Sequence, residues 1–326
     1  MSKPPSITSN QPGLAGPEIV ASRSFSPADL RVAERSAGIS AFLRVRNGAD
    51  FLAATIESHL PHFDEVVAVY NNCSDDTPGI LLRLRQKHGP KLRVLHYIDR
   101  VFPPGSEGHA STDPASPASF VNFTNVALAE TRYRIVAKID DDHLAIPTAM
   151  AQLTARLRAE PVSNVLECFS GPNLMRDART GVLGICNSVP ISGLGDVGFF
   201  HVNAETYFTH DRRFEMFRSV NLKRRFAGFI YWHLKYLKSG NGFGNYELQD
   251  NPQSRYHKQQ ARFEASEVIS LADLRQTLKA DRFRLRLLAP LSERYAIRLA
   301  QVNALLAGEP LEDVAAVEAR IRAFGA

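Results

Sequence analysis

One stretch of the sequence, residues 135–143, constrains the fold more than any other. It begins with an apolar run that only Lys138 interrupts, which predicts a buried strand. The strand leads directly into Asp140, Asp141 and Asp142. In open α/β sheets, the carboxyl ends of the strands border the crevice where ligands bind. The stretch therefore predicts an α/β fold with a ligand site at this edge of the sheet.

Three adjacent carboxylates need a compensating cation. Side chains two residues apart on an extended segment point the same way, so Asp140 and Asp142 are expected to converge. Mg²⁺ or Mn²⁺ fits such a place, because carboxylates commonly hold these ions and substrate phosphates complete their coordination. His143 is the expected supporting contact to the metal or the phosphate. The residues alone leave a second interpretation open, a solvated acidic loop ahead of a helix that begins near Pro147.

Length and composition allow one large core, or a core with a helical appendage. The chain has 326 residues, of which 44% are hydrophobic, and a formal net charge of +5 that favours anionic partners. Its three cysteines are odd in number and lack a close metal-binding spacing, which favours reduced thiols in a cytoplasmic protein. No signal peptide or membrane-spanning apolar run is expected.

Strands and helices alternate along the first half of the chain. Alternation at this spacing favours a parallel sheet with right-handed crossover connections. The expected strands are residues 38–43, 66–70 and 92–98, and the expected helices are residues 49–59, 78–88, 120–130 and 148–159.

The remaining segments carry weaker signals. Residues 1–36, rich in Ser, Pro and Ala, are expected to form a disordered arm, and residues 99–119 a long loop of the kind that often forms a lid. Turn-rich residues 160–202 predict antiparallel strands. Helices are expected from Asp211 onward, including residues 227–238, and two or three amphipathic helices should close the chain.

Two classes of nucleotide-binding protein are disfavoured because their phosphate-binding loops are missing. No Gly-x-Gly-x-x-Gly and no Gly-Lys-Ser loop follows an expected strand, so phosphates would have to be held by a metal. A phosphatase that forms an aspartyl-phosphate stays open as a third interpretation. In such an enzyme the two aspartates follow the first strand and a Thr comes after them. Here the acids follow about the fourth strand, and Leu144 occupies the position of that Thr.

The order of the motifs in residues 38–150 resembles that of glycosyltransferases of the GT-A fold, specifically family-2-like enzymes. In that family an Asp- or Asn-Gly-Ser-x-Asp pattern after the second strand holds the base and ribose of the nucleotide. The pattern is matched by residues 71–76, in which Cys73 replaces the usual Gly and Asn71 the usual acid. The family's Ala-Arg-Asn helix is matched by residues 123–125, and its Asp-x-Asp motif by residues 140–142.

The resemblance implies a fold, a cofactor and a set of site residues. The fold is a GT-A type, Rossmann-like, mostly parallel sheet flanked by helices. Residues 37–260 would form the transferase domain, with a donor half at 37–150 and an acceptor half at 151–260, and residues 261–326 a helical extension. Mn²⁺ or Mg²⁺ would be held by Asp140, Asp142 and His143. The nucleotide-sugar would contact Arg44, Asn71, Asn72, Ser74, Asp76, Asn125, Lys138, Asp140 and Asp141.

In inverting members of the family, an Asp or Glu downstream of the metal motif is the base, often in an acidic pair at the start of a helix. That pair is absent here, since His210 precedes Asp211. Asp211 is the expected base, with Glu215 second because it lies one helical turn later, and Asp196 is a third candidate.

The expected reaction is transfer of a sugar, with a UDP-sugar as donor, onto a saccharide or lipid-linked saccharide in surface polysaccharide synthesis. A catalytically inactive GT-A scaffold in a polysaccharide assembly stays open as an alternative. No nucleic-acid partner is expected. Aromatic and basic residues at 223–238 and a basic, amphipathic segment at 274–298 are compatible with peripheral contact to the anionic inner face of the membrane, although packed or solvated helices explain both equally well.

Overall fold

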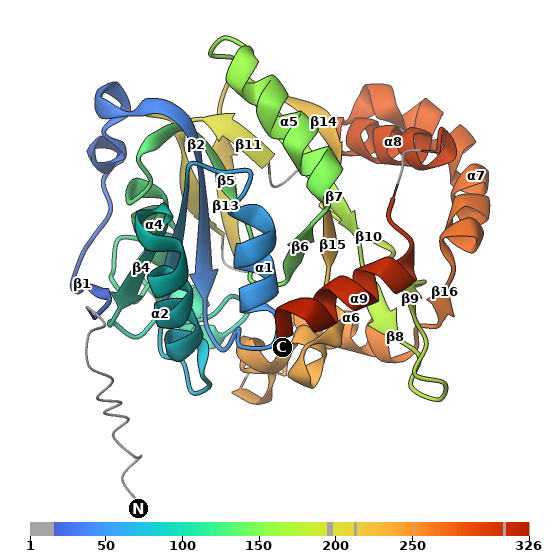
Figure 1. Cartoon of the computed structure of the whole chain (residues 1–326), viewed down its shortest axis with the longest axis horizontal. Helices are drawn as coiled ribbons and strands as arrows, with labels where there is room; N and C mark the ends of the chain where they lie inside the picture. Colours follow the sequence, from blue (N-terminus) through green and yellow to red (C-terminus); the bar gives the residue numbers. More distant parts are fainter. Residues whose placement is uncertain (1–15, 194–197, 212–213, 251, 309–310, 326) are drawn as a thin grey trace, which may run out of the picture.

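A nine-stranded mixed sheet forms the centre of the molecule (Figure 1). The computed structural model describes residues 16–193, 198–211, 214–250, 252–308 and 311–325. The strand order is β1-β4-β3-β2-β5-β11-β7-β10, and β14 pairs with β7. The strands are β1 (Glu18–Val20), β2 (Ser36–Val45), β3 (Glu65–Tyr70), β4 (Leu92–Tyr97), β5 (Tyr133–Lys138), β7 (Val165–Pro172), β10 (Ile191–Ser192), β11 (Gly198–His201) and β14 (Lys223–Phe229).

Five adjacent strands of this sheet, β1, β4, β3, β2 and β5, run parallel, and β11 is antiparallel to both β5 and β7. From β2 the chain adds β3 and β4 on one side and then returns to place β5 on the other side of β2. The direction of winding therefore reverses between β2 and β5. The carboxyl ends of the strands at such a reversal are where open α/β sheets bind ligands.

The helices cover both faces of the sheet because β2 and its neighbours are apolar on both sides. Ile39, Ala41 and Leu43 of β2 pack in one core with α1, α2 and α5. Phe42 points to the opposite face and packs in a second core with α4. The helices are α1 (Leu52–His59), α2 (Thr77–His88), α3 (Glu107–Ser111), α4 (Phe120–Ala129), α5 (Pro147–Ala159), α6 (Arg255–Glu264), α7 (Leu271–Leu288), α8 (Glu293–Leu306) and α9 (Val314–Gly325).

Three small antiparallel sheets surround the large one. They are the hairpin β12 (Thr206–Asp211) with β13 (Phe214–Ser219), the pair β6 (His143–Ala145) with β15 (Tyr231–His233), and the triple β16 (Val268–Ile269), β9 (Leu183–Cys186) and β8 (Leu174–Arg176). In the β6–β15 pair, His233 lies opposite His143. This pairing carries the start of the C-terminal third of the chain to the end of β5, next to the three acids.

The expected α/β fold with a mostly parallel central sheet and flanking helices is confirmed, and two expectations about segments are wrong. Within the arm expected over residues 1–36, the part that the structure describes is packed: β1 pairs with β4, and Leu30 is fully buried. The helices expected from Asp211 and over residues 227–238 are instead the strands β12–β15, followed by the short 3₁₀ helix η4 (Lys235–Leu237). A short apolar run does not by its periodicity distinguish a buried strand from a buried helix.

No helix in the described ranges combines the length and the apolar character that crossing a bilayer requires.

Candidate active site

The three acids follow β5 at the point where the winding of the sheet reverses, and they lie in different environments. Asp140 is nearly half exposed, and its Oδ1 lies 3.1 Å from Lys138 Nζ. Asp142 is buried, and His143 Nε2 lies 3.9 Å from Asp140 Oδ2. Asp140 therefore pairs with Lys138 close to the surface, whereas Asp142 is enclosed by the protein.

Lys238 supplies the cation that the two inner acids need. Its Nζ lies 2.8 Å from Asp141 Oδ1 and 3.0 Å from Asp142 Oδ2. Burial raises the pKa of Asp141 to about 6, with the charge of Asp142 acting in the same direction and that of Lys238 against it. Although burial opposes both effects, the mutual attraction raises the pKa of Lys238 and holds the pKa of Asp142 well below its usual range. The protein itself therefore compensates much of the negative charge.

The second carboxylate oxygen of Asp142, Oδ1, lies close to His233 but forms no hydrogen bond with it. Asp142 Oδ1 is buried without a hydrogen-bond donor, and His233 Nε2 lies 3.3 Å away. His233 Nδ1 is 2.6 Å from the side-chain oxygen of Asn173. The amide nitrogen of Asn173 donates to the carbonyl of Val189, which fixes the orientation of that amide.

These contacts assign the tautomer of His233. Because the Asn173 oxygen only accepts, Nδ1 must carry the hydrogen, and in the neutral ring Nε2 then presents a lone pair to a carboxylate oxygen. Two acceptors at this distance repel unless a proton or a metal ion lies between them. A histidine that donates from one nitrogen to an amide oxygen, and offers the other nitrogen, has the usual arrangement of a metal ligand.

His143 lies beside this pair, and in the tautomer described below it could bind a metal only after giving up its hydrogen bond from Asp140. Its ring is buried and stacks on Tyr231 with 3.8 Å between ring centroids, and burial lowers the pKa of His143 to about 3, so the ring is neutral. The backbone N–H of Asp140 donates to its Nδ1 at 3.5 Å, which leaves the Nε2 hydrogen on the side of the Asp140 carboxylate. Atoms able to bind a metal on Asp142, His143 and His233 lie within 4.8 Å of one another.

The residues present fit a divalent ion. Asp142 Oδ1 is a buried carboxylate oxygen without a hydrogen bond, and the outer nitrogen of the His233 imidazole lies 3.3 Å from it. A mixed carboxylate and imidazole set suits Mn²⁺ better than Mg²⁺, which prefers oxygen ligands throughout.

A second charged network joins the exposed acid to the β12–β13 hairpin. Arg44, near the end of β2, lies with its Nη2 2.9 Å from Glu215 Oε1, and Lys138 Nζ lies 3.9 Å from the same oxygen. Arg44 also donates to Thr124 Oγ1 at 2.6 Å and lies over the ring of Phe120. One charged cluster therefore lies beside the winding reversal of the sheet. It consists of two cations, Arg44 and Lys138, and two carboxylates, Asp140 and Glu215.

The hairpin separates the candidate bases. In its antiparallel register Glu215 pairs with His210 and Phe217 with Phe208, which places all four side chains on one face. That face is the inner one, since Phe208 and Phe217 pack in the core. Asp211 pairs with Phe214 and belongs to the opposite face. The helix on which the choice of Asp211 depended is absent, and Asp196 lies outside the described residues.

The expected nucleotide loop divides into buried and exposed members. Asn71 is buried and donates to the carbonyls of Tyr97 and Asp99, so it ties β3 to the end of β4. Asn72 is exposed, as is Ser74, which bonds to Asn47. The exposed Asp76 pairs with Arg83 at 2.7 Å.

Asn125, on α4, serves the fold. Its side chain is buried and makes two hydrogen bonds to the backbone of Phe208, accepting at 2.7 Å and donating at 2.8 Å. Both bonds attach α4 to β12. The structure therefore gives the Asn71 and Asn125 side chains packing partners, and leaves Asn72, Ser74 and Asp76 at the surface.

Sequence reasoning missed His233, Lys238 and Asn173. All but Asn173 lie in or at the end of the helix expected over residues 227–238, where Lys238 is one of several basic residues. The run Tyr231-Trp232-His233 carries no alternation that would mark a strand, and only its pairing with β6 places the imidazole of His233 at the acids.

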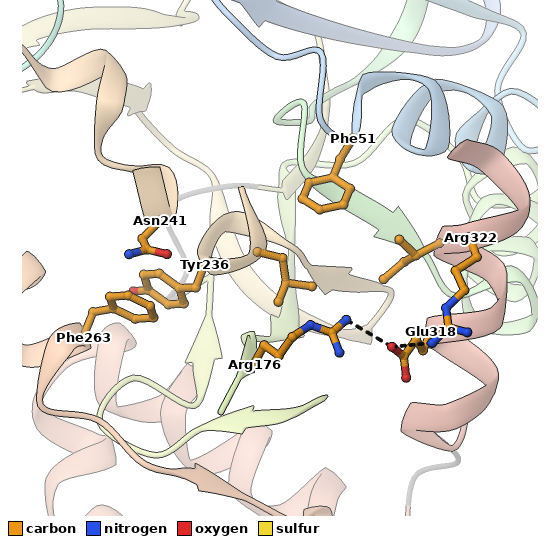
Figure 2. Close-up of a pocket in the computed structure, with 9 residues that line it drawn as sticks. Phe51, Arg176, Tyr236, Asn241, Phe263, Glu318 and Arg322 are labelled. Carbon is orange, nitrogen blue, oxygen red and sulfur yellow. Dashed lines mark hydrogen bonds and ion pairs between the residues drawn. The ribbon is translucent and has the colours of Figure 1, made fainter. Parts of the chain in front are cut away.

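A separate pocket of about 310 Å³ lies between η4 and α9 (Figure 2). Tyr236, Phe51 and Phe263 line it, and Figure 2 shows Glu318 between Arg176 and Arg322, at 3.1 and 2.9 Å. None of the three acids lines this pocket, and the ion pairs compensate the charge of Glu318.

Comparison with known proteins finds similarity to solved structures alone, and only over about half of the chain. No protein-family model and no curated protein matches the chain. Glucosyl-3-phosphoglycerate synthase from Mycobacterium tuberculosis, solved with Mn²⁺ and UDP-glucose, matches with 19% identity and a TM-score of 0.28, over 51% of this chain and 54% of that one. The same enzyme with Mn²⁺, UDP and phosphoglyceric acid matches with 19% identity and a TM-score of 0.27, over 51% of this chain and 53% of that one. A structure described as a mycobacterial protein matches with 19% identity and a TM-score of 0.27, over 47% of this chain and 46% of that one. The chain thus spans about half the length of these structures, and likeness at this level assigns it no function.

The substitution Lys238→Met tests the internal cation. It should lower the free energy of unfolding of the metal-free protein by about 3–5 kcal/mol, because two buried carboxylates lose their countercharge. Denaturant titration measures the change. Lys235→Met is the matched control, since Lys235 lies on the same turn and contacts the aromatic rings of Tyr236, Phe243 and Tyr246. Equal destabilisation by the two substitutions would show that the ion pairs with Asp141 and Asp142 contribute little.

The substitution His233→Gln tests the metal ligand. Mn²⁺ at about 100 times its dissociation constant should stabilise the parent protein by about 2.7 kcal/mol. The variant should lose most of this stabilisation, because it lacks the imidazole that faces Asp142. Thermal unfolding with and without Mn²⁺ measures it, and His62→Gln serves as the control. A Mn²⁺-dependent rise in Tm that is the same in all three proteins would rule out His233 as a ligand.

Proposed function

We propose that this chain is a metal-dependent glycosyltransferase of the GT-A type, which transfers a sugar from a nucleotide-sugar, with UDP as the expected nucleotide, to an acceptor hydroxyl. The observation that carries the proposal is the pair formed by Asp142 Oδ1 and His233 Nε2 at the winding reversal of the sheet. It combines a place where α/β sheets bind ligands with a donor set that fits a divalent ion.

When bound, the metal would supply Lewis-acid compensation for the charge that develops on the departing nucleotide diphosphate. The chain's own residues extend that compensation. Arg44 and Lys138 carry two cationic groups beside the partly exposed Asp140, and guanidinium and ammonium groups are the side chains that bind phosphate oxygens best. We assign them to the diphosphate, with Asn72, Ser74 and Asp76 as the exposed candidates for the nucleoside.

Glu215 is the base that we propose for the acceptor hydroxyl. Its carboxylate is mostly buried, lies on the inner face of the hairpin and belongs to the same cluster as Asp140. Arg44 and Lys138 share its Oε1, which positions the group and leaves Oε2 for a hydroxyl. Inversion of configuration is the stereochemical outcome that we propose, and this part of the proposal depends on the family resemblance of the motifs.

The acceptor that we propose is a saccharide or a lipid-linked saccharide in surface polysaccharide synthesis. This part of the proposal depends on the family resemblance of the motifs. One observation favours a second candidate, an inactive GT-A scaffold: Lys238 already pairs with Asp141 and Asp142, so the acids are compensated without a metal. The two candidates differ in turnover, because a scaffold binds without catalysing.

A panel of nucleotide-sugars incubated with Mn²⁺ tests the proposal. We expect metal-dependent hydrolysis or transfer of at least one UDP-sugar, lost in Asp140→Asn and in Asp142→Asn. Glu215→Gln should reduce the rate by about 100-fold or more while UDP still raises the Tm in the presence of Mn²⁺, because the base does not hold the nucleotide.

Asp211→Asn is the matched control, since it changes a carboxylate on the outer face of the same hairpin, and its rate should stay close to the parent's. Loss of activity in Asp211→Asn with retention in Glu215→Gln would return the role to Asp211. Binding of UDP and Mn²⁺ without turnover of any sugar would favour the scaffold.

A further inference from the structure

Four exposed apolar side chains gather where α7 passes into α8. Phe283 is 73% exposed, Leu287 63%, Leu291 76% and Tyr295 40%. They recur every four residues across the end of α7, the 3₁₀ helix η8 (Ala289–Leu291) and the start of α8. Scattered single exposed apolar residues are ordinary, but several in one short segment of the surface point to an interaction site. We call these four residues the α7–α8 apolar patch.

The two patch residues on α7, Phe283 and Leu287, lie on the side of that helix that faces away from the protein. Leu274, Leu278 and Leu285 of α7 are buried in the core that α8 and α9 share. At 100° per residue, Phe283 and Leu287 lie on roughly the opposite side of the helix. Figure 1 shows α7 at the outer edge of the molecule, at the end farthest from β1. The inner stripe packs α7 in place, so the outer stripe has no role in holding the fold together.

Basic residues surround the patch. Residues 271–298 contain seven Arg or Lys and three Asp or Glu, a net charge of +4 where the whole chain carries +5. Within the described part of the chain, four exposed cations of this segment form no ion pair: Lys279, Arg284, Arg286 and Arg294. Lys279 and Arg286 share the outer side of α7 with Phe283, and Arg284 flanks Leu287. The segment thus carries positive charge that other groups of the chain leave uncompensated.

A hollow beside the patch has the same character. A pocket of about 260 Å³ is lined by Arg294, Tyr295 and Arg298 of α8 and by residues 188–191. Two guanidinium groups at its wall suit a phosphate-bearing headgroup.

We propose that the α7–α8 apolar patch and its surrounding cations dock the protein on an anionic lipid bilayer. Apolar side chains flanked by Arg and Lys insert at the boundary between headgroups and acyl chains, while the cations bind the anionic headgroups. The aromatic residues 229–232 take no part, because Phe229, Tyr231 and Trp232 are buried in the core. A bilayer fits better than a second copy of the chain, since two copies of this face would bring unpaired cations together.

Sedimentation with large unilamellar vesicles tests the docking surface. The parent protein should pellet with phosphatidylglycerol-containing vesicles at low salt, should pellet less at high salt and should stay in solution with pure phosphatidylcholine. Phe283→Ser with Leu287→Ser, and separately Arg284→Glu with Arg286→Glu, should each weaken the partition by about tenfold or more. Circular dichroism melting curves check that the variants are folded.

Matched controls separate this surface from general stickiness. Val162→Ser with Val182→Ser removes exposed apolar side chains elsewhere, and Lys258→Glu with Arg262→Glu reverses two exposed charges on α6. Both controls should bind vesicles more strongly than the patch variants. Equal binding by patch and control variants, or no binding of the parent to anionic vesicles, would overturn the proposal. A parent dimer that the Phe283 and Leu287 substitutions convert to a monomer, without vesicle binding, would assign the face to self-association instead.

Discussion

The ion pairs of Lys238 with Asp141 and Asp142 hold together two parts of the chain almost 100 residues apart, and the site depends on them. Taking a carboxylate out of water costs several kcal/mol, and a partner that also donates hydrogen bonds is needed to offset that cost. Lys238 is itself largely buried and can meet both acids only because β15 pairs with β6. The same pairing places His233 opposite His143. One pairing of short strands therefore creates both the counterion and the candidate metal ligand.

The segment that carries Lys238 is attached to the loop after β2 as well. The backbone N–H of Ser239 donates to Asp50, Asn245 bonds to the Arg46–Asn47 turn, and Arg46 pairs with Glu247. Residues 238–247 thus cover the carboxyl ends of β2 and β5. Together with the Arg44–Glu215 pair on the hairpin, these contacts bring elements from three regions of the sequence to one edge of the sheet.

Much of the N-terminal half could be predicted from sequence, because its local signals agree with its tertiary structure. Thr77 and Pro78 open α2, Gly89 ends it, and continuous apolar runs form parallel strands that are buried on both faces. The acids at the end of β5 follow from the same logic. The hydrogen bonds of Asn71 and Asn125 could not be predicted in this way. Each side chain bonds to the backbone of a residue far away in the sequence, and no local pattern identifies that residue.

The second half resisted prediction for a related reason. Within residues 206–233, β14 and β15 form strands through pairing with segments far away in the sequence, and the aromatic content of the whole stretch is compatible with a buried helix. In a helix, Asp211 and Glu215 would lie one turn apart on the same face. In the β12–β13 hairpin they lie on opposite faces. Because side chains repeat every 2 residues in a strand and every 3.6 in a helix, the hairpin brings Glu215, and not Asp211, next to Arg44.

The central claim is that Asp142 and His233 share a divalent metal ion. Crystals of the protein grown with UDP and Mn²⁺, measured at the manganese absorption edge, test it most directly. We expect an anomalous difference peak within bonding distance of Asp142 Oδ1 and His233 Nε2. An occupied UDP site without such a peak, or a peak bound by Asp140 while His233 stays unliganded, would contradict it.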